Sequence, residues 1–251
     1  MKMLARICGV APVADRSNSY SEFVSCFPSK KSLSDPFVCR WVYRPFSFPI
    51  AWKLASFGVS ANAVTLISIG FSVVAALMIA IGQYPWMIAA SVLMLLVALG
   101  DCVDGNIARA KNTSGPGGEW MDALCGYTVY ALLPLALGLH LELVGTEALF
   151  AGMWVLAGAV TAISNLYLRL VYQKYANSIR SAERDGDGGS KGGMLSRISG
   201  ELGLVGWMMP ALLLAVVLGL EPFYLLFYCA LYLASAVVGT IVLARRILHA
   251  E

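Results

Sequence analysis

The chain has 251 residues, of which 59% are hydrophobic and only 13% are charged, and its mean hydropathy is +0.72. This composition excludes an ordinary soluble domain and indicates that lipid surrounds most of the chain. The formal net charge of +3 is too small to indicate nucleic acid as a partner, and the six cysteines lack the close spacing of a zinc site.

The N-terminal part divides into two regions. Residues 1–36 are polar and lack the uninterrupted apolar run of a cleaved signal peptide. Residues 37–58 mix aromatic side chains with Arg40, Arg44 and Lys53. Because this mixture just before a membrane span is typical of a helix in the membrane interface, we expect an interfacial amphipathic helix there. A segment packed in the protein core is the alternative.

The remaining residues, 59–251, contain six apolar stretches. A spanning helix needs roughly 20 mostly apolar residues to cross about 30 Å of hydrocarbon. The predicted spans are residues 62–82, 85–109, 118–144, 148–172, 202–220 and 222–248. The predicted fold class is therefore an all-α integral membrane protein with a bundle of six transmembrane helices, and Pro210 is expected to kink the fifth of them.

The basic residues predict the orientation of this bundle. All 18 lysines and arginines fall in the N-terminal region, in or beside the second and fourth connections, or at the C-terminal end. The opposite connections carry only Glu142, Glu147 and Glu221 as charged residues. Because basic residues accumulate in cytoplasmic segments, both termini are predicted to be cytosolic. The compact chain is interpreted as a protein of the bacterial plasma (inner) membrane.

Three carboxylates lie inside the predicted spans, those of Asp101, Asp104 and Asp122. Ionisable residues in a span are costly and therefore mark functional sites. At about 1.5 Å per residue, Asp101 lies about 24 Å along the second span, near the cytosolic end where the third span begins. Grouped carboxylates repel one another unless a cation bridges them, so the sequence predicts bound Mg²⁺ or Mn²⁺. A purely structural polar network is the alternative.

Small residues accompany these aspartates on the same helical faces. Gly105 and Ala108 follow on the second span, and Gly118 and Gly126 flank Asp122 on the third. Small side chains leave room for a bulky group, and a hard divalent ion keeps open positions for phosphates. The pattern therefore indicates a site for a nucleotide diphosphate that faces the cytosol.

The spacing of these residues resembles the signature of the CDP-alcohol phosphotransferase (phosphatidyltransferase) family, D-x2-D-G-x2-A-R-x8-G-x3-D-x3-D. The positions that match are Asp101, Asp104, Gly105, Ala108, Arg109, Gly118 and Asp122. Residues 60–65 are similar to the family's P-N-x-x-T entry to the first span. The count of six helices and a cytosolic site also agree with the family.

The resemblance implies a metal-dependent transferase. Asp101, Asp104 and Asp122 would bind one or two Mg²⁺ or Mn²⁺ ions that hold the diphosphate of a CDP-alcohol donor, either CDP-diacylglycerol or a small CDP-alcohol. A phospho-alcohol group would pass to an alcohol acceptor with release of CMP, as in phospholipid biosynthesis. The substrate-binding residues implied in the same way are Gly105, Ala108, Arg109 and Gly118. Membrane lipid is a further implied partner, and a homodimer is the common assembly of the family.

The chain departs from the signature at its last aspartate, where Gly126 stands. In the family this aspartate is usually assigned as the general base for the acceptor hydroxyl. Catalysis would then depend on Asp122 and on Glu119, water or an acidic group of the acceptor in place of that base. The alternative is a degenerate, non-catalytic member that binds CDP-lipid or metal as a scaffold or sensor. A transporter is disfavoured because the sequence contains no internal repeat.

Overall fold

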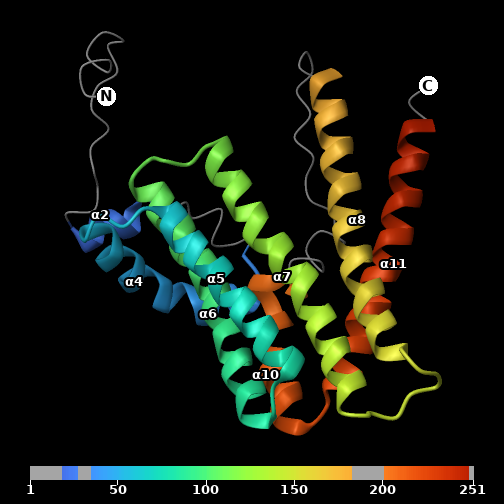
Figure 1. Cartoon of the computed structure of the whole chain (residues 1–251). Helices are drawn as coiled ribbons and strands as arrows, with labels where there is room; N and C mark the ends of the chain where they lie inside the picture. The colour runs from blue at the N-terminus through green and yellow to red at the C-terminus, as the bar shows by residue number, and fades with distance from the viewer. Residues whose placement is uncertain (1–18, 28–34, 183–200, 249–251) are drawn as a thin grey trace.

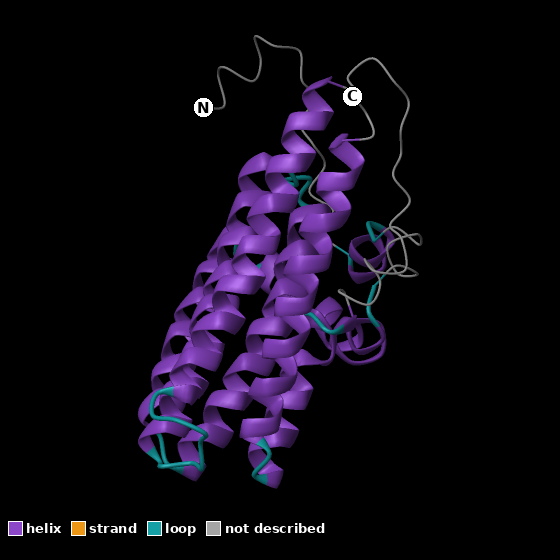
Figure 2. Cartoon of the chain, turned by 90° about the vertical axis from the view of Figure 1, so that its right-hand side faces the viewer, coloured by secondary structure: helices purple, strands orange, loops and turns teal. Residues whose placement is uncertain are grey.

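The computed structural model describes residues 19–27, 35–182 and 201–248, and within them the fold is helical without a strand (Figures 1 and 2). This confirms the predicted all-α fold. The elements are α2 (Tyr20–Ser25), the π-helical segment η1 (Cys39–Tyr43), α4 (Arg44–Ser56), α5 (Ala61–Ile81), α6 (Tyr84–Ala110), α7 (Pro116–Leu143), α8 (Met153–Ala182), the π-helical segment η2 (Leu204–Met208), α10 (Met209–Leu218) and α11 (Glu221–Leu248). Most of the predicted polar region 1–36 lies outside the described residues.

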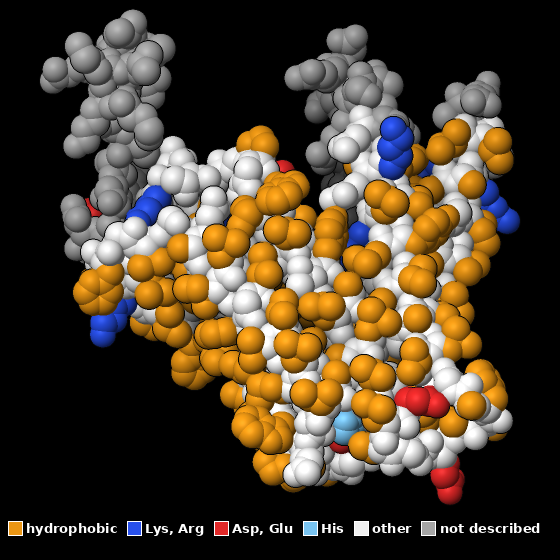
Figure 3. Space-filling model, viewed as in Figure 1, with side chains coloured by type: hydrophobic (Ala, Val, Ile, Leu, Met, Phe, Trp, Pro, Cys, Tyr) orange, Lys and Arg blue, Asp and Glu red, His pale blue; other side chains and the backbone are white. Residues whose placement is uncertain are grey.

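Five of the described helices, α5, α6, α7, α8 and α11, are long and apolar enough to cross a membrane. The chain is therefore an integral membrane protein. The fifth of the six predicted spans is instead a shorter apolar helix, Leu204–Leu218. Apolar side chains cover most of the face of the bundle that is in view. The Lys and Arg groups in view lie mainly toward its upper end, whereas the lower end shows acidic groups and a histidine (Figure 3).

The shorter apolar helix has the kink that we expected from Pro210, and the kink lies at Gly206, near the start of the helix. Gly206 has the non-helical φ/ψ of −98° and −135°, while Pro210 lies in the first turn of α10 rather than inside a continuous helix. In a regular helix the N–H of residue 210 would bond to the carbonyl of residue 206, but proline has no N–H. The missing hydrogen bond thus accounts for a break four residues before the proline.

The long helices pack side by side, with α5 against α6 and α7, and α8 between α7 and α11 (Figure 1). Helices α7 and α8 approach closely because two glycines face the opposite backbone. A Cβ atom on Gly138 would collide with the carbonyl oxygen of Trp154, and one on Gly158 with that of Pro134. Small residues at helix contacts are the usual device for close packing in a membrane.

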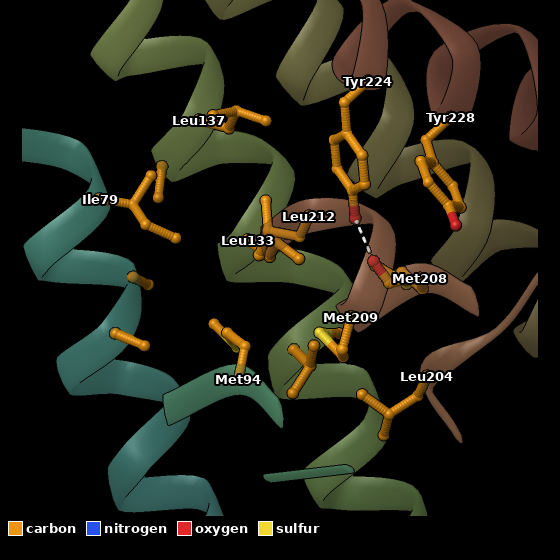
Figure 4. Close-up of a cluster of buried hydrophobic side chains, with 14 of the residues drawn as sticks. Ile79, Met94, Leu133, Leu137, Leu204, Met208, Met209, Leu212, Tyr224 and Tyr228 are labelled. Carbon is orange, nitrogen blue, oxygen red and sulfur yellow. Dashed lines mark hydrogen bonds between the residues drawn. The ribbon is translucent and has the colours of Figure 1, made fainter. Parts of the chain in front are cut away.

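The apolar core lies between α5, α6, α7, α10 and α11. Its largest fully buried side chains include Ile79, Met94, Leu133, Leu137 and Leu212 (Figure 4). These residues interdigitate along the middle of the bundle, so the charged residues of the motif are left at one end of α6 and α7.

Helix α4 lies beside α6 and crosses it at a steep angle (Figure 1). Its buried positions are polar or small, as at Arg44, Ser47 and Ala51, whereas large apolar side chains such as Phe46 and Ile50 are exposed. A helix in water would show the reverse pattern. The apolar outer face supports the interfacial placement expected for residues 37–58, which stays a prediction.

The start of this helical segment is anchored to the region of η2. The backbone N–H of Phe37 donates to both carboxylate oxygens of Glu201, at 3.0 and 2.9 Å, and the Phe37 ring stacks on Trp207 with 6.3 Å between centroids. A carboxylate at a helix N-terminus is favourable because it accepts unpaired N–H groups and faces the positive end of the helix dipole. These contacts hold α4 in place against α6.

Candidate functional site

A cavity of about 210 Å³ lies between α5, α6, α7 and the beginning of α4. All eight residues predicted for the site line it: Asp101, Asp104, Gly105, Ala108, Arg109, Gly118, Glu119 and Asp122. The other lining residues are Arg44, Ala61, Asn62, Thr65, Thr113, Ser114 and Gly115. The structure thus brings the predicted residues together around one space, as the spacing of the motif led us to expect.

The three aspartates face one another across this cavity. Asp101 and Asp104 lie one turn apart near the end of α6, and Asp122 lies in the second turn of α7. The carboxyl group of Asp101 lies close enough to those of Asp122 and Asp104 to interact electrostatically with both. The aspartates therefore meet as a cluster, and none of them forms an ion pair with another described residue.

The carboxylates of this cluster are suitable ligands for a metal ion, but they are not arranged as a complete metal site. An all-carboxylate set of oxygen atoms suits a hard divalent ion such as Mg²⁺ or Mn²⁺. Within the part of the chain that the structure describes, however, no group of three or more His, Cys, Asp and Glu side chains stands in a ligating arrangement. The cluster therefore supplies carboxylate ligands for such an ion without forming a complete coordination shell.

Thr65 orients one of the aspartates. Its hydroxyl lies 2.6 Å from Oδ2 of Asp104, a short hydrogen bond between α5 and α6. Helix α5 begins at an N-cap where Ser60 Oγ accepts the N–H of Ala63 at 3.2 Å, and Thr65 follows one turn later. We had not predicted Thr65 as a site residue, although the similarity of residues 60–65 to the family's first-span entry was the signal that could have identified it.

A second arginine joins Arg109 at the cavity. Arg109 Nη2 donates to Asn106 Oδ1 at 2.9 Å, and Arg44 Nη1 of α4 donates to the same oxygen at 3.0 Å. Arg44 Nε pairs with Asp35 at 2.8 Å. Both guanidinium groups lie over the ring of Phe27, with Cζ at 4.4 Å for Arg44 and 5.2 Å for Arg109. No feature of the sequence links residue 44 to the motif, so only the structure identifies it.

The glycines at two positions of the motif, 105 and 126, differ in the space around them. A Cβ atom on Gly105 would lie 3.1 Å from Arg109 Nη2, so the glycine makes room for the guanidinium group to fold back over α6. A Cβ atom on Gly126 would meet only a ring carbon of Tyr130, at 3.9 Å. Position 126 therefore has room for a side chain, although the chain places none there.

Glu119 lies in the first turn of α7 and faces two spaces. One is the cavity with the aspartates. The other is an adjacent cavity of about 320 Å³, lined chiefly by the α7 side chains Trp120 and Tyr127 and by Gln173 of α8. Its carboxylate thus stands at the boundary between the aspartate cluster and a second space large enough for a small molecule.

The sequence profile of the CDP-alcohol phosphatidyltransferase family matches residues 58–242. The match covers well over half of the chain and runs from just before α5 into α11. It includes every residue that lines the cavity except Arg44. A search of the curated proteins finds no match.

Proposed function

Since the chain belongs to the CDP-alcohol phosphatidyltransferase family, we propose that it transfers a phospho-alcohol group from a CDP-activated donor to an alcohol acceptor and releases CMP in lipid biosynthesis. Membership of the family indicates a transferase that acts on a CDP-alcohol donor and an alcohol acceptor. The observation that supports the full proposal is the single cavity around which all eight predicted site residues meet.

The proposal includes a divalent metal, Mg²⁺ or Mn²⁺, as one or two ions. Asp101, Asp104 and Asp122 would supply its carboxylate ligands, and Thr65 would keep Asp104 turned toward the cavity. When bound, such an ion neutralises negative charge on the phosphoryl group and on the departing CMP. A partner residue that orients a ligand commonly matters nearly as much as the ligand itself.

The donor would lie along the small residues of the motif. Gly105, Ala108 and Gly118 leave the wall of the cavity without bulky side chains, which gives a cytidine base room beside the aspartates. Arg109 would neutralise phosphate charge at the end of α6, since its guanidinium group lines the same space. The position of each residue in the cavity supports these roles.

The transfer itself requires a base. The acceptor oxygen attacks the phosphorus that carries the alcohol group, the bond from this phosphorus to the CMP oxygen breaks, and the acceptor hydroxyl releases its proton. Glu119 is the proposed proton acceptor because it stands between the aspartate cavity and the adjacent cavity beside Trp120. Water or an acidic group of the acceptor could take the same proton.

The proposal places the aspartate cavity on the cytosolic side of a bacterial plasma membrane. Its support is the distribution of charge, since the lysines and arginines accumulate at the ends of the bundle on that side. The donor carries a nucleotide, and nucleotides are made in the cytosol. A cavity on the cytosolic side is therefore accessible to the nucleotide part of the donor.

The test is CMP release by the purified full chain in mixed micelles. Either CDP-diacylglycerol or CDP-choline is supplied with Mg²⁺ or Mn²⁺ and a panel of alcohols, with EDTA as the matched control. We expect turnover with at least one pair of substrates and its loss in EDTA. Tight donor binding without turnover on any alcohol would instead support a non-catalytic scaffold or sensor, for which the glycine at position 126 is the argument.

A further inference from the structure

Arg44 and Arg109 form an unusual pair of neighbouring cations. Arg44 is only 7% exposed, and both guanidinium groups donate to the same oxygen, Oδ1 of Asn106. Like charges in a poorly solvated environment repel one another strongly. Such a pair is stable only if negative charge compensates both of its members.

Within the described residues only one member of the pair forms an ion pair, although Arg109 also lies near the negative charges of Asp35 and Asp104. Asp35 forms an ion pair with Arg44, and it is the only salt bridge within the described parts of the chain. Arg109 has no such partner there, and its Nε is buried without a hydrogen bond. The bond from Arg44 to Asn106 is enough to hold α4 against α6. The presence of Arg109 on the same oxygen atom therefore needs a separate explanation.

The surroundings of the two guanidinium groups indicate where a negatively charged ligand would bind. Phe27 lies against both guanidinium groups, and Asp35 and Asn106 occupy Nε and Nη1 of Arg44. Nη2 of Arg44 makes no hydrogen bond to the described residues, and both arginines line the cavity that holds the aspartates. The side chains of both arginines therefore form part of the wall of this cavity.

We propose that Arg44 and Arg109 together bind a phosphoryl group of a substrate in the cavity. A guanidinium fork matches phosphate oxygens in geometry and charge, and two forks side by side suit a group with more than one negative charge. The inference rests on the proposed function for the identity of the substrate. The phosphoryl group belongs either to the diphosphate of the donor or to a phosphate carried by the acceptor.

This assignment gives the N-terminal part of the chain a role at the site. Arg44, Phe27 and Asp35 all precede residue 58, where the match to the family begins. Asp35 fixes the direction of the Arg44 side chain through Nε, while Phe27 packs against both cations. Arg44 is thus a substrate-binding residue supplied by the interfacial segment, and Asp35 is a positioning residue that acts through it.

The test compares ligands that differ only in phosphate. Dissociation constants of cytidine and CDP, and of glycerol and glycerol 3-phosphate, are measured with Mg²⁺ for the full chain and for Arg44→Gln. If the pair binds the donor, the affinity ratio of CDP to cytidine falls about tenfold or more in Arg44→Gln. If it binds a phosphate on the acceptor, the ratio of glycerol 3-phosphate to glycerol falls instead.

Two control variants separate binding from structure. Lys53→Gln removes an exposed charge from the same helix and leaves both ratios unchanged. Asp35→Asn removes the charge of the same ion pair but keeps the guanidinium group and an oxygen that can accept its Nε–H, so the ratio that falls in Arg44→Gln falls by less in this variant. Thermal unfolding of each variant in detergent checks that it is folded.

Unchanged ratios for both pairs of ligands in Arg44→Gln overturn the inference. An equal loss in Asp35→Asn and Arg44→Gln overturns it as well, because the ion pair then acts only on structure. Failure of the unmodified chain to bind either cytidine compound counts against the proposed function, and the glycerol 3-phosphate measurement still decides the arginine site.

Discussion

Two regions of the bundle contain polar groups among apolar helices, and the two differ in the space around these groups. At one end of α6 and α7, aspartates and arginines surround a cavity of about 210 Å³. Between α7, α8, η2 and α11, a cluster of four tyrosines surrounds a space of only about 10 Å³; they are Tyr130, Tyr224, Tyr228 and Tyr232. The first region leaves polar atoms facing an opening, whereas the second leaves almost no space.

Two hydroxyl groups of the tyrosine cluster form hydrogen bonds with the protein backbone. Tyr130 accepts the backbone N–H of Leu204 at 2.9 Å, and Tyr224 donates to the carbonyl oxygen of Met208 at 3.2 Å (Figure 4). These bonds fall on η2, where the break at Gly206 leaves backbone groups without regular helical partners. Since lipid offers no hydrogen bonds, the tyrosines supply them.

The comparison teaches that a buried polar group has one of two functions here. A group with a partner inside the protein stabilises the fold, as the tyrosines do at η2. A group that faces other like charges across a cavity costs stability until a ligand compensates it. Substitutions in the two regions should therefore affect different measurements, stability in one and activity in the other.

The largest effect is expected from Asp104→Asn. Loss of one carboxylate ligand should lower metal-dependent CMP release roughly 10³-fold, because metal stabilisation of phosphoryl charge contributes several kcal/mol. Thermal stability should stay the same or rise, since one of three neighbouring carboxylates is neutralised. The matched control is Glu147→Gln at an exposed position. A large drop in stability with unchanged turnover would place Asp104 with the structural polar groups instead.

A smaller effect, of opposite sign, is expected from Gly126→Asp. A positioned general base typically contributes about 10²-fold or more, so turnover should rise by about 10²-fold if its absence limits the rate. A Cβ atom fits at this position, 3.9 Å from the ring of Tyr130. Gly126→Ala tests the space alone and should leave turnover unchanged. Collapse of metal-dependent activity in the aspartate variant, but not in the alanine variant, would contradict the arrangement proposed for the cavity.

Thr65→Val sharpens the comparison because it changes a group that touches the cluster without belonging to it. Loss of the 2.6 Å hydrogen bond to Asp104 should lower turnover about tenfold, as is typical for partners that orient metal ligands. Thr65→Ser keeps the hydroxyl and should keep most of the activity. The measurement is CMP release as a function of Mg²⁺ concentration, and equal behaviour of the two variants would mean that the hydroxyl does not act through Asp104.

The smallest effect is expected in the tyrosine cluster. Tyr224→Phe removes the hydrogen bond to Met208 and should lower the free energy of unfolding by about 1 kcal/mol. Donor affinity and turnover should stay unchanged. Thermal unfolding in detergent provides the measurement, with Tyr84→Phe at an exposed position as control. A loss of turnover without a loss of stability would assign this region to the site.

Much of this arrangement could be read from the sequence alone. Apolar stretches of sufficient length determine spanning helices, and the helical period places Asp101 and Asp104 on one face because both features are local. The short connection before α7 then leaves little freedom for Asp122. The residues predicted around the cavity were accordingly the ones found there, although their roles stay predictions.

Only the tertiary structure decided the features that depend on distant parts of the chain. Arg44 meets Asn106 across 62 residues of sequence, and this contact depends on how α4 packs against α6. Pro210 removes one backbone hydrogen bond at Gly206, but the partners of the other backbone groups at this break, Tyr130 and Tyr224, come from distant helices. Local sequence specifies a helix and its faces, whereas packing between helices determines which faces meet.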